Sequence, residues 1–145
     1  MNLEGCLACD ATAGRVDVPG GRIAETDHWC AEHCLGPLGV GAMVVKTKEH
    51  VESLWELPDG AAEELGPFLR RMSAALVDGL GAERAYLTMW VDKPPLHVHL
   101  VVYPRWPDEV ERGPALDQKR YDAGDPPPEA AAEAAKRLRA YLHKH

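Results

Sequence analysis

Two histidines one residue apart mark the most informative segment of the chain, Leu96-His97-Val98-His99-Leu100-Val101. Side chains on a β-strand alternate between its two faces, so His97, His99 and Val101 are expected to share one face. Burying an imidazole without a hydrogen-bond partner costs about 1–3 kcal/mol. The two rings therefore need partners, and a metal ion, a bound ligand or polar groups within a protein core could each supply them.

Two cysteines near the start of the chain, Cys6 and Cys9, have the Cys-x-x-Cys spacing with which two thiolates bind one metal ion. Zinc favours four sulfur and nitrogen ligands. No histidine lies close to this pair in the sequence, so imidazole ligands would come from farther along the chain. His50, at the end of an expected strand, and the histidine pair at 97 and 99 are the available donors.

Length and charge narrow the class of protein. The 145 residues are enough for one domain with a real core and no disulfides. A net charge of −7 argues against sequence-independent binding to nucleic acid and against electrostatic anchoring to a membrane. No apolar run approaches the roughly 20 residues that span a bilayer, and the N-terminus does not look like a signal peptide. We therefore expect a cytoplasmic protein with reduced thiols.

Hydrophobic periodicity predicts an α+β domain with a mostly antiparallel sheet, one main helix and a C-terminal helix. The expected strands cover 22–26, 29–34, 40–46, 85–91 and 96–103. The expected helices cover 49–57, 59–80 and 129–143, with Pro67 kinking the second helix or delaying its start. The segment 106–128 is rich in Pro, Asp and Gly and is expected to be a long irregular loop.

The order of these features resembles the histidine triad (HIT) superfamily, and most of all its bacterial zinc-binding branch. The likeness runs from Cys6 to Arg105: Cys-x-x-Cys, a strand ending near His50, a helix, then His-x-His-x-x-x-x-Pro-Arg. It implies a HIT-like fold with a five-stranded sheet and a core at about 6–105. It also implies a structural zinc ion bound by Cys6, Cys9, His50 and His97, a homodimer, and a nucleotide or other small phosphorylated ligand.

The resemblance further implies a reaction. The middle histidine of the triad corresponds to His99, whose neutral ring would attack a nucleotide phosphorus and form a nucleotidyl-histidine that water or another acceptor resolves. The other ring nitrogen of His99 would be held as a donor, often by a backbone carbonyl, so that the attacking nitrogen keeps its lone pair. The protein would then be a nucleotide hydrolase or nucleotidyl transferase.

Several positions depart from the pattern of that family. The third triad position is Val101. A ribose-binding Asp is expected near Cys34, followed by an apolar residue such as Leu35, and a Gly-Gln-Ser stretch is replaced by 93–96, which contains two prolines without N–H groups. Lys93 could supply charge to a phosphate or simply be solvated. Trp90 could stack on a flat ligand or pack in the core.

Cys30 and Cys34, with His28 and His33 nearby, contain the residue types of a second metal site. On a strand, however, His33 would point away from the other three side chains. We therefore expect Cys30 to be a small buried hydrophobic residue and Cys34 to line a ligand pocket.

Two functions of different class follow from these features. The first is the enzyme described above, acting through His99. The second is a noncatalytic, zinc-stabilised HIT-like module that binds a nucleotide or another ligand. The discriminating feature is whether His99 lies at a solvent-accessible cleft or is buried by Val101 and Trp90.

Overall fold

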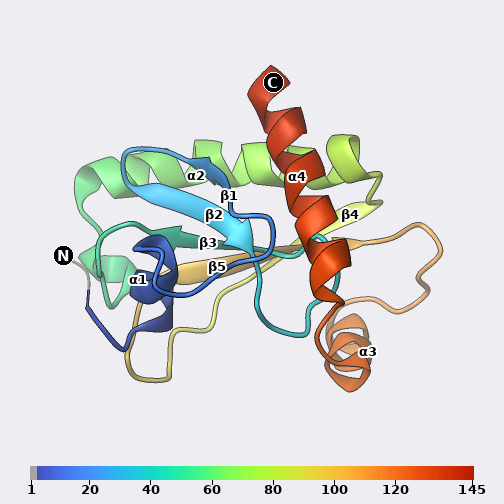
Figure 1. Cartoon of the computed structure of the whole chain (residues 1–145), viewed down its shortest axis with the longest axis horizontal. Coiled ribbons are helices and arrows are strands. Elements are labelled where there is room, and N and C mark those ends of the chain that lie inside the picture. The colour runs from blue at the N-terminus through green and yellow to red at the C-terminus, as the bar shows by residue number, and fades with distance from the viewer. Residues whose placement is uncertain (1–2) are drawn as a thin grey trace.

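The computed structural model describes residues 3–145 and shows an α+β fold around a five-stranded sheet (Figure 1). The strand order is β1-β2-β3-β5-β4, and every neighbouring pair is antiparallel. The strands are β1 (Arg22–Glu25), β2 (Trp29–His33), β3 (Met43–Thr47), β4 (Arg84–Thr88) and β5 (His99–Arg105). The predicted fold class is therefore confirmed.

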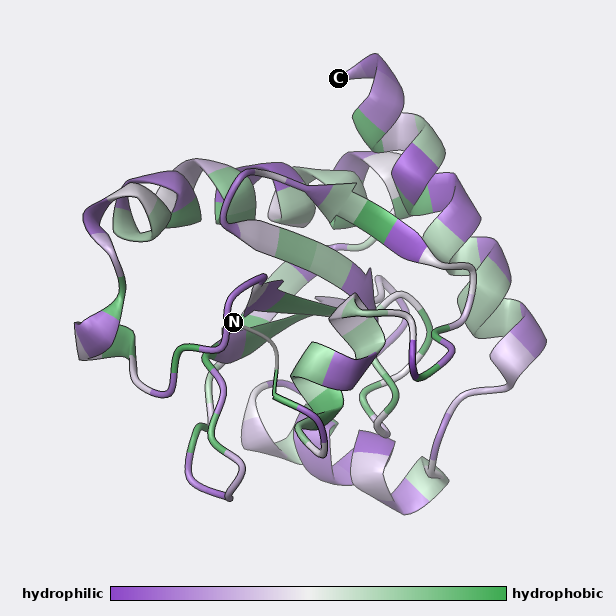
Figure 2. Cartoon of the chain, turned by 60° about the vertical axis from the view of Figure 1, so that its left-hand side comes forward, coloured by the Kyte–Doolittle hydropathy of each residue, from purple (hydrophilic) through white to green (hydrophobic). Residues whose placement is uncertain are grey.

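Two long helices cover one face of this sheet. Helix α2 (Asp59–Ala74) continues as the π-helical turn η2 (Ala75–Gly79), and α4 (Pro128–Lys144) packs against β1, β2 and η2. Figure 2 shows hydrophobic strands in the middle of the molecule and helices with hydrophobic and hydrophilic bands, as expected for helices with one apolar face. This layer holds the main core: Trp29, Met43, Val45, Phe68, Met72, Leu76, Val98, Val102, Ala135 and Leu138.

The opposite face of the sheet carries the polar side chains that matter for function. The short helix α1 (Leu7–Thr12) lies over this face (Figure 1). Register pairing puts Lys46 opposite His99, and Val44 opposite both Glu32 and Val101. Because side chains alternate along each strand, these five residues share the face beneath α1.

The helix expected over 49–57 is wrong except for one 3₁₀ turn, η1 (Leu54–Glu56). The Val51 carbonyl accepts a hydrogen bond of 2.8 Å from the backbone N–H of Val98, which lies in the segment that leads into β5. That carbonyl is used outside the segment, so it does not start a helical turn. Because Val51 follows His50 and Val98 follows His97, this hydrogen bond holds the backbones of the two histidines close together.

The irregular loop expected over 106–128 contains a helix, α3 (Pro114–Ala123). Gly113 precedes it with positive φ and Pro114 occupies its first turn, which is a recognised helix start that the loop-like composition concealed. The side chain of Arg120 fixes α3 to the fold through the carbonyl of Pro104 (2.8 Å) and the carboxylate of Glu109 (2.6 Å).

The other expectations for helices are close to the structure. Helix α4 confirms the predicted C-terminal helix. Pro67 lies inside α2 without delaying its start at Asp59, since Pro67 is exposed and water can satisfy the carbonyl that its missing N–H leaves free. Within residues 3–145, no helix is long and apolar enough to cross a membrane.

Candidate zinc site and ligand cavity

The four predicted zinc ligands come together in space. Their ligand atoms, the Sγ atoms of Cys6 and Cys9 and one ring nitrogen each of His50 and His97, lie within 4.8 Å of one another. Nδ1 of His97 is 3.5 Å from Sγ of Cys6 and 3.4 Å from Sγ of Cys9. Nδ1 of His50 is 3.3 Å from Sγ of Cys9.

Hydrogen bonds orient both rings of this cluster as metal ligands. Nε2 of His97 donates to the carbonyl oxygen of Thr47 at 2.8 Å, which leaves the Nδ1 lone pair directed at the thiols. Nε2 of His50 lies 3.4 Å from the carboxylate of Glu52. Metal-binding histidines usually donate their second N–H in this way. Burial lowers the pKa of His97 to about 4, so its ring is neutral, as a ligand must be.

The chemistry of the cluster therefore fits a structural zinc ion. Two thiols and two imidazole nitrogens form the closed, four-ligand set that zinc favours. The ligands come from three segments: the start of α1, the end of β3 and the entry to β5. A bound ion would tie these segments together beside the sheet.

His99, two residues from a predicted ligand, lies outside the metal cluster. Its Nδ1 donates to the carbonyl oxygen of His97 at 2.8 Å. Its Nε2 has no hydrogen-bond partner among residues 3–145, and its half-buried ring lines a cavity. The expectation that a backbone carbonyl fixes the His99 tautomer is consistent with this geometry, although His97 itself precedes β5 rather than lying within it.

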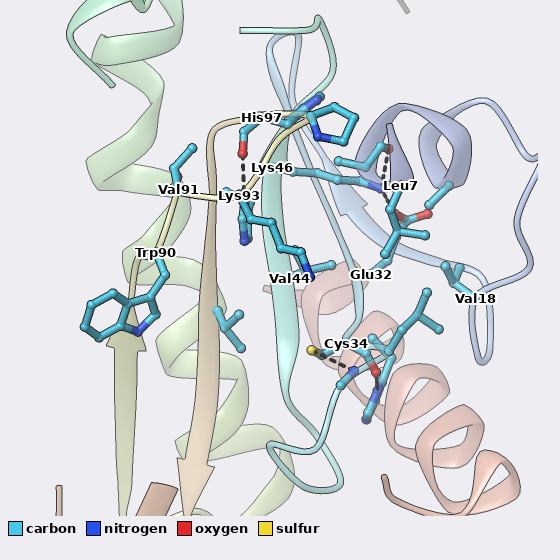
Figure 3. A pocket seen from close by; sticks show the side chains of 18 of the residues that line it. Leu7, Val18, Glu32, Cys34, Val44, Lys46, Trp90, Val91, Lys93 and His97 are labelled. Atoms are coloured by element: carbon cyan, nitrogen blue, oxygen red, sulfur yellow. Dashed lines mark hydrogen bonds and ion pairs between the residues drawn. The ribbon is translucent and has the colours of Figure 1, made fainter. Parts of the chain in front are cut away.

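The cavity has a volume of about 460 Å³ and lies between α1, the polar sheet face and the 90–95 segment (Figure 3). All five residues predicted to contact a nucleotide line it: Cys34, Leu35, Trp90, Lys93 and Val101. Trp90 is 73% exposed, so of its two alternatives core packing is wrong. His99 is not buried by Val101 and Trp90, because it shares this accessible cavity with them.

One side of the cavity is apolar and the other contains charge. Leu7, Ala8, Ala11, Val18 and Val44 form the apolar wall. Beside them, the carboxylate of Glu32 and the ammonium group of Lys46 form an ion pair, with side chains 3% and 1% exposed. Sequence reasoning missed this pair, although a lysine within the apolar run Met43-Val44-Val45-Lys46 was a signal for it.

The second group of cysteines and histidines does not assemble. Among residues 3–145, the only group of candidate ligands close enough to hold a metal is the Cys6 cluster. His28 pairs instead with Glu64 at 3.0 Å, and Cys30 is buried. His33 lines the cavity, with Nδ1 donating to the Cys34 carbonyl at 2.9 Å and Nε2 accepting from the Gly41 N–H at 2.9 Å.

Comparison with known proteins places this geometry in a structural class. A zinc-bound histidine triad family protein from Mycobacterium smegmatis is 21% identical, with a TM-score of 0.70 over 97% of this chain and 94% of that one. A hypothetical histidine triad nucleotide-binding protein from Sulfolobus tokodaii is 17% identical, with a TM-score of 0.77 over 96% and 93% of the two chains. No protein-family model and no curated protein matches the chain.

A third structure extends the comparison. A Hit-like protein involved in cell-cycle regulation from Bartonella henselae, solved with an unknown ligand, is 16% identical, with a TM-score of 0.73 over 97% and 98% of the two chains. The chain thus has the fold of the histidine triad proteins, as the sequence resemblance predicted. Its Cys2His2 cluster and the zinc-bound neighbour together support zinc as the metal.

Proposed function

We propose that the protein binds a nucleotide in the cavity and that His99 is the nucleophile of a phosphoryl reaction. The observation that carries the proposal is the hydrogen bond of 2.8 Å between Nδ1 of His99 and the His97 carbonyl. It keeps the proton on Nδ1 and the lone pair on Nε2, in a ring that lines the cavity. The fold of a histidine triad nucleotide-binding neighbour supports a nucleotide as the ligand.

The proposed reaction has two balanced steps. In the first, the Nε2 lone pair forms a bond to phosphorus while the bond from phosphorus to the leaving group breaks and its electron pair departs with that group. An amine leaving group, as in a phosphoramidate, takes up a proton from solvent as it departs. In the second, a water oxygen attacks phosphorus, the N–P bond breaks, and the water gives up a proton to solvent. His99 regains its lone pair and a nucleoside monophosphate is released. The side chains of the zinc ligands form no bond to the substrate in either step, and the His97 backbone carbonyl holds the Nδ1 proton of His99.

The wall of the cavity favours substrates with good leaving groups. Phosphoryl transfer depends on donors that stabilise charge on the phosphoryl oxygens. Val101 offers none, and Pro94 and Pro95 lack N–H groups. Lys93, exposed at the cavity, is a candidate cation for the phosphate. We therefore expect phosphoramidates and polyphosphates to react in preference to nucleotides with poorer leaving groups.

A turnover assay tests this function. Wild type and His99→Ala would be incubated with adenosine phosphoramidate, diadenosine polyphosphates and a nucleotide sugar, with His143→Ala in the last turn of α4 as a matched control. We expect turnover by wild type and the control, and a loss of roughly 1000-fold or more in His99→Ala. Equal turnover by all three proteins would contradict the proposal.

The second candidate function is a noncatalytic, zinc-stabilised module that binds a nucleotide or similar ligand. The missing phosphate donors at Val101 and Pro94–Pro95 favour it. Its signature in the same assay is binding of a nucleotide to wild type with no turnover of any substrate. The cytoplasmic location and the homodimer stay predictions, and sedimentation of the purified protein would test the second of these.

A further inference from the structure

The ion pair between Glu32 and Lys46 has an unusual position. Both side chains are almost completely buried, yet both line the cavity rather than the apolar core between the sheet and the long helices. Burying an ion pair is costly, and apolar residues of similar size often serve stability as well or better. Stability therefore gives a poor account of the pair, and its position suggests contact with a ligand.

The contacts of the pair leave hydrogen-bonding capacity unused. The Lys46 ammonium group has three donors. One faces Oε1 of Glu32 and another donates to the carbonyl of Ala8 at 3.0 Å. Among residues 3–145, the third N–H of Lys46 and the second oxygen, Oε2, of Glu32 have no hydrogen-bond partner. The cavity wall thus presents a donor beside an acceptor.

The distance from Glu32 to His99 suits a nucleotide. Glu32 lies on β2 and His99 on β5, with β3 between them. Glu32 and His99 are two strand spacings and two residues apart, about 12 Å between backbones, which is close to the length of a nucleotide from the far edge of its base to its 5′-phosphate. Lys46 starts directly opposite His99, and its side chain extends to Glu32 and to the Ala8 carbonyl. The apolar wall that starts at Leu7 and Val18 lies on the Glu32 side, whereas Trp90 and Lys93 lie on the other (Figure 3). The Glu32 side of the cavity therefore combines an apolar wall with one pair of charged groups. This combination fits a flat apolar ring system that has hydrogen-bonding groups along one edge.

We propose that Glu32 and Lys46 are specificity-determining residues that bind the polar edge of a purine base. A ring N–H or an exocyclic amino group of the base donates to Oε2 of Glu32, and a ring nitrogen or carbonyl of the base accepts from Lys46. The phosphate then points toward His99. The inference rests on the proposed function, because it assumes a nucleotide ligand.

Calorimetric binding of three probes tests the inference. AMP offers the edge both a donor and acceptors, purine riboside 5′-monophosphate has the acceptors without the exocyclic donor, and ribose 5-phosphate has no base. The double variant Glu32→Leu/Lys46→Met removes both charges without leaving one unpaired. The Ala8 carbonyl keeps its bond of 2.8 Å from the Thr12 hydroxyl in this variant. The matched control, Glu25→Leu/Lys48→Met, removes a partly exposed pair joined at 2.7 Å outside the cavity.

In wild type and the control, AMP should bind about 10-fold or more tightly than purine riboside 5′-monophosphate, since the analogue leaves Glu32 without a donor. In the cavity double variant this ratio should fall to about 2 or less, while the affinity for ribose 5-phosphate stays the same. Zinc content and a cooperative melt would show that the variant is folded. If the double variant is not folded, Glu32→Gln is measured in its place. Glu32→Gln should lower the affinity for AMP without lowering the affinity for purine riboside 5′-monophosphate.

The outcomes separate the two proposals. If wild type binds AMP and the analogue equally well, the role of Glu32 and Lys46 is wrong although the cavity still binds nucleotides. If the double variant discriminates as strongly as wild type, the same conclusion holds. If wild type binds none of the three probes, the proposed function fails together with this inference.

Discussion

The zinc site and the ligand cavity share one short segment, and they use its two histidines in opposite ways. His97 directs Nδ1 to the thiols and gives its other N–H to Thr47, so both of its nitrogens face partners inside the protein. His99 gives one N–H to the His97 carbonyl and keeps its second nitrogen for the cavity. A site that holds the fold together satisfies its polar atoms internally. A site that acts on a ligand leaves some of them unsatisfied.

The zinc site and the cavity also differ in how strictly they require particular residue types. The metal cluster needs four residues of fixed type and closes around one point. The cavity is bounded by residues from many segments, and its character depends on which side chains happen to face it. Each ligand of the first kind of site is limited to the few residue types that bind zinc, whereas residues that line the second can change while the fold is kept. Val101 and Cys34 differ from the residues that the family resemblance predicts at these positions, although the fold is that of the histidine triad proteins.

The largest effect expected is the contrast between neighbouring histidines in metal binding. His97→Ala removes a ligand and leaves a gap in the buried cluster, so we expect loss of bound zinc and a melting temperature lower by about 10 °C or more. His99→Ala should keep a stoichiometric zinc ion because His99 is outside the cluster. Metal analysis by mass spectrometry with thermal melts measures both quantities. Equal zinc content in the two variants would contradict the division of roles.

Chelation of the metal should affect the cavity as well. Cys9 lies in α1, whose residues Leu7, Ala8 and Ala11 form part of the cavity wall. Without an ion, α1 keeps few ties to the sheet, among them the bond of 3.0 Å from Lys46 to the Ala8 carbonyl. We expect a chelator to weaken AMP binding by about 10-fold, and added zinc to restore it. Unchanged affinity in zinc-free protein would show that the two sites are independent.

A smaller effect should appear in the pH dependence of stability. Burial lowers the pKa of His33 below its usual value of 6.5, so the unfolded chain binds more protons than the folded one as the pH falls below that value. The contribution of His33 to stability is thus present above pH 6.5 and is lost as the pH falls toward the folded pKa. The loss is at most about 1.4 kcal/mol per pH unit.

Denaturant unfolding of wild type and His33→Gln between pH 7.5 and about pH 5.5 measures the contribution of His33 to the free energy of unfolding. The variant should be less stable at neutral pH and should show the flatter profile, because it lacks the titrating ring. Zinc ligands are the same in both proteins, so their titration cancels in the comparison. Parallel profiles would mean that His33 is not the source of the slope.

The smallest effect is expected at Trp90, which is 73% exposed at the cavity. Trp90→Ala removes little buried area, so the free energy of unfolding should change by about 0.5 kcal/mol or less. The proposed base position lies on the other side of the cavity, so AMP affinity should stay within about two-fold. A large loss of AMP affinity in Trp90→Ala, measured by calorimetry, would indicate that the base binds beside Trp90 and not beside Glu32.

The sequence predicted the zinc site more completely than the cavity, for a physical reason. Metal ligands are limited to a few residue types, so the family pattern alone was enough to name Cys6, Cys9, His50 and His97. The sheet was predictable because each strand shows apolar periodicity between clear turns. Helix α3 was not, since its start at Gly113-Pro114 lies in a segment with the composition of a loop.

The Glu32–Lys46 pair was hidden for another reason. Each residue alone is compatible with an exposed strand position, and only the packing of α1 over β2 and β3 shows that both are buried beside a cavity. Similarly, the Val51 carbonyl that prevents a helix at 49–57 is bonded to Val98, which is 47 residues away in the sequence. Pairings between distant segments carry no local sequence signal.

The most direct test of the account is to look for the covalent intermediate on His99. Wild type would be mixed with adenosine phosphoramidate, quenched within milliseconds to seconds, and digested for mass spectrometry of its peptides, with His99→Ala treated in parallel. The account predicts a nucleotidyl group on His99 of wild type and none on the variant, with zinc retained in both. Turnover that proceeds with no adduct on His99, or an adduct that persists in His99→Ala, would contradict it.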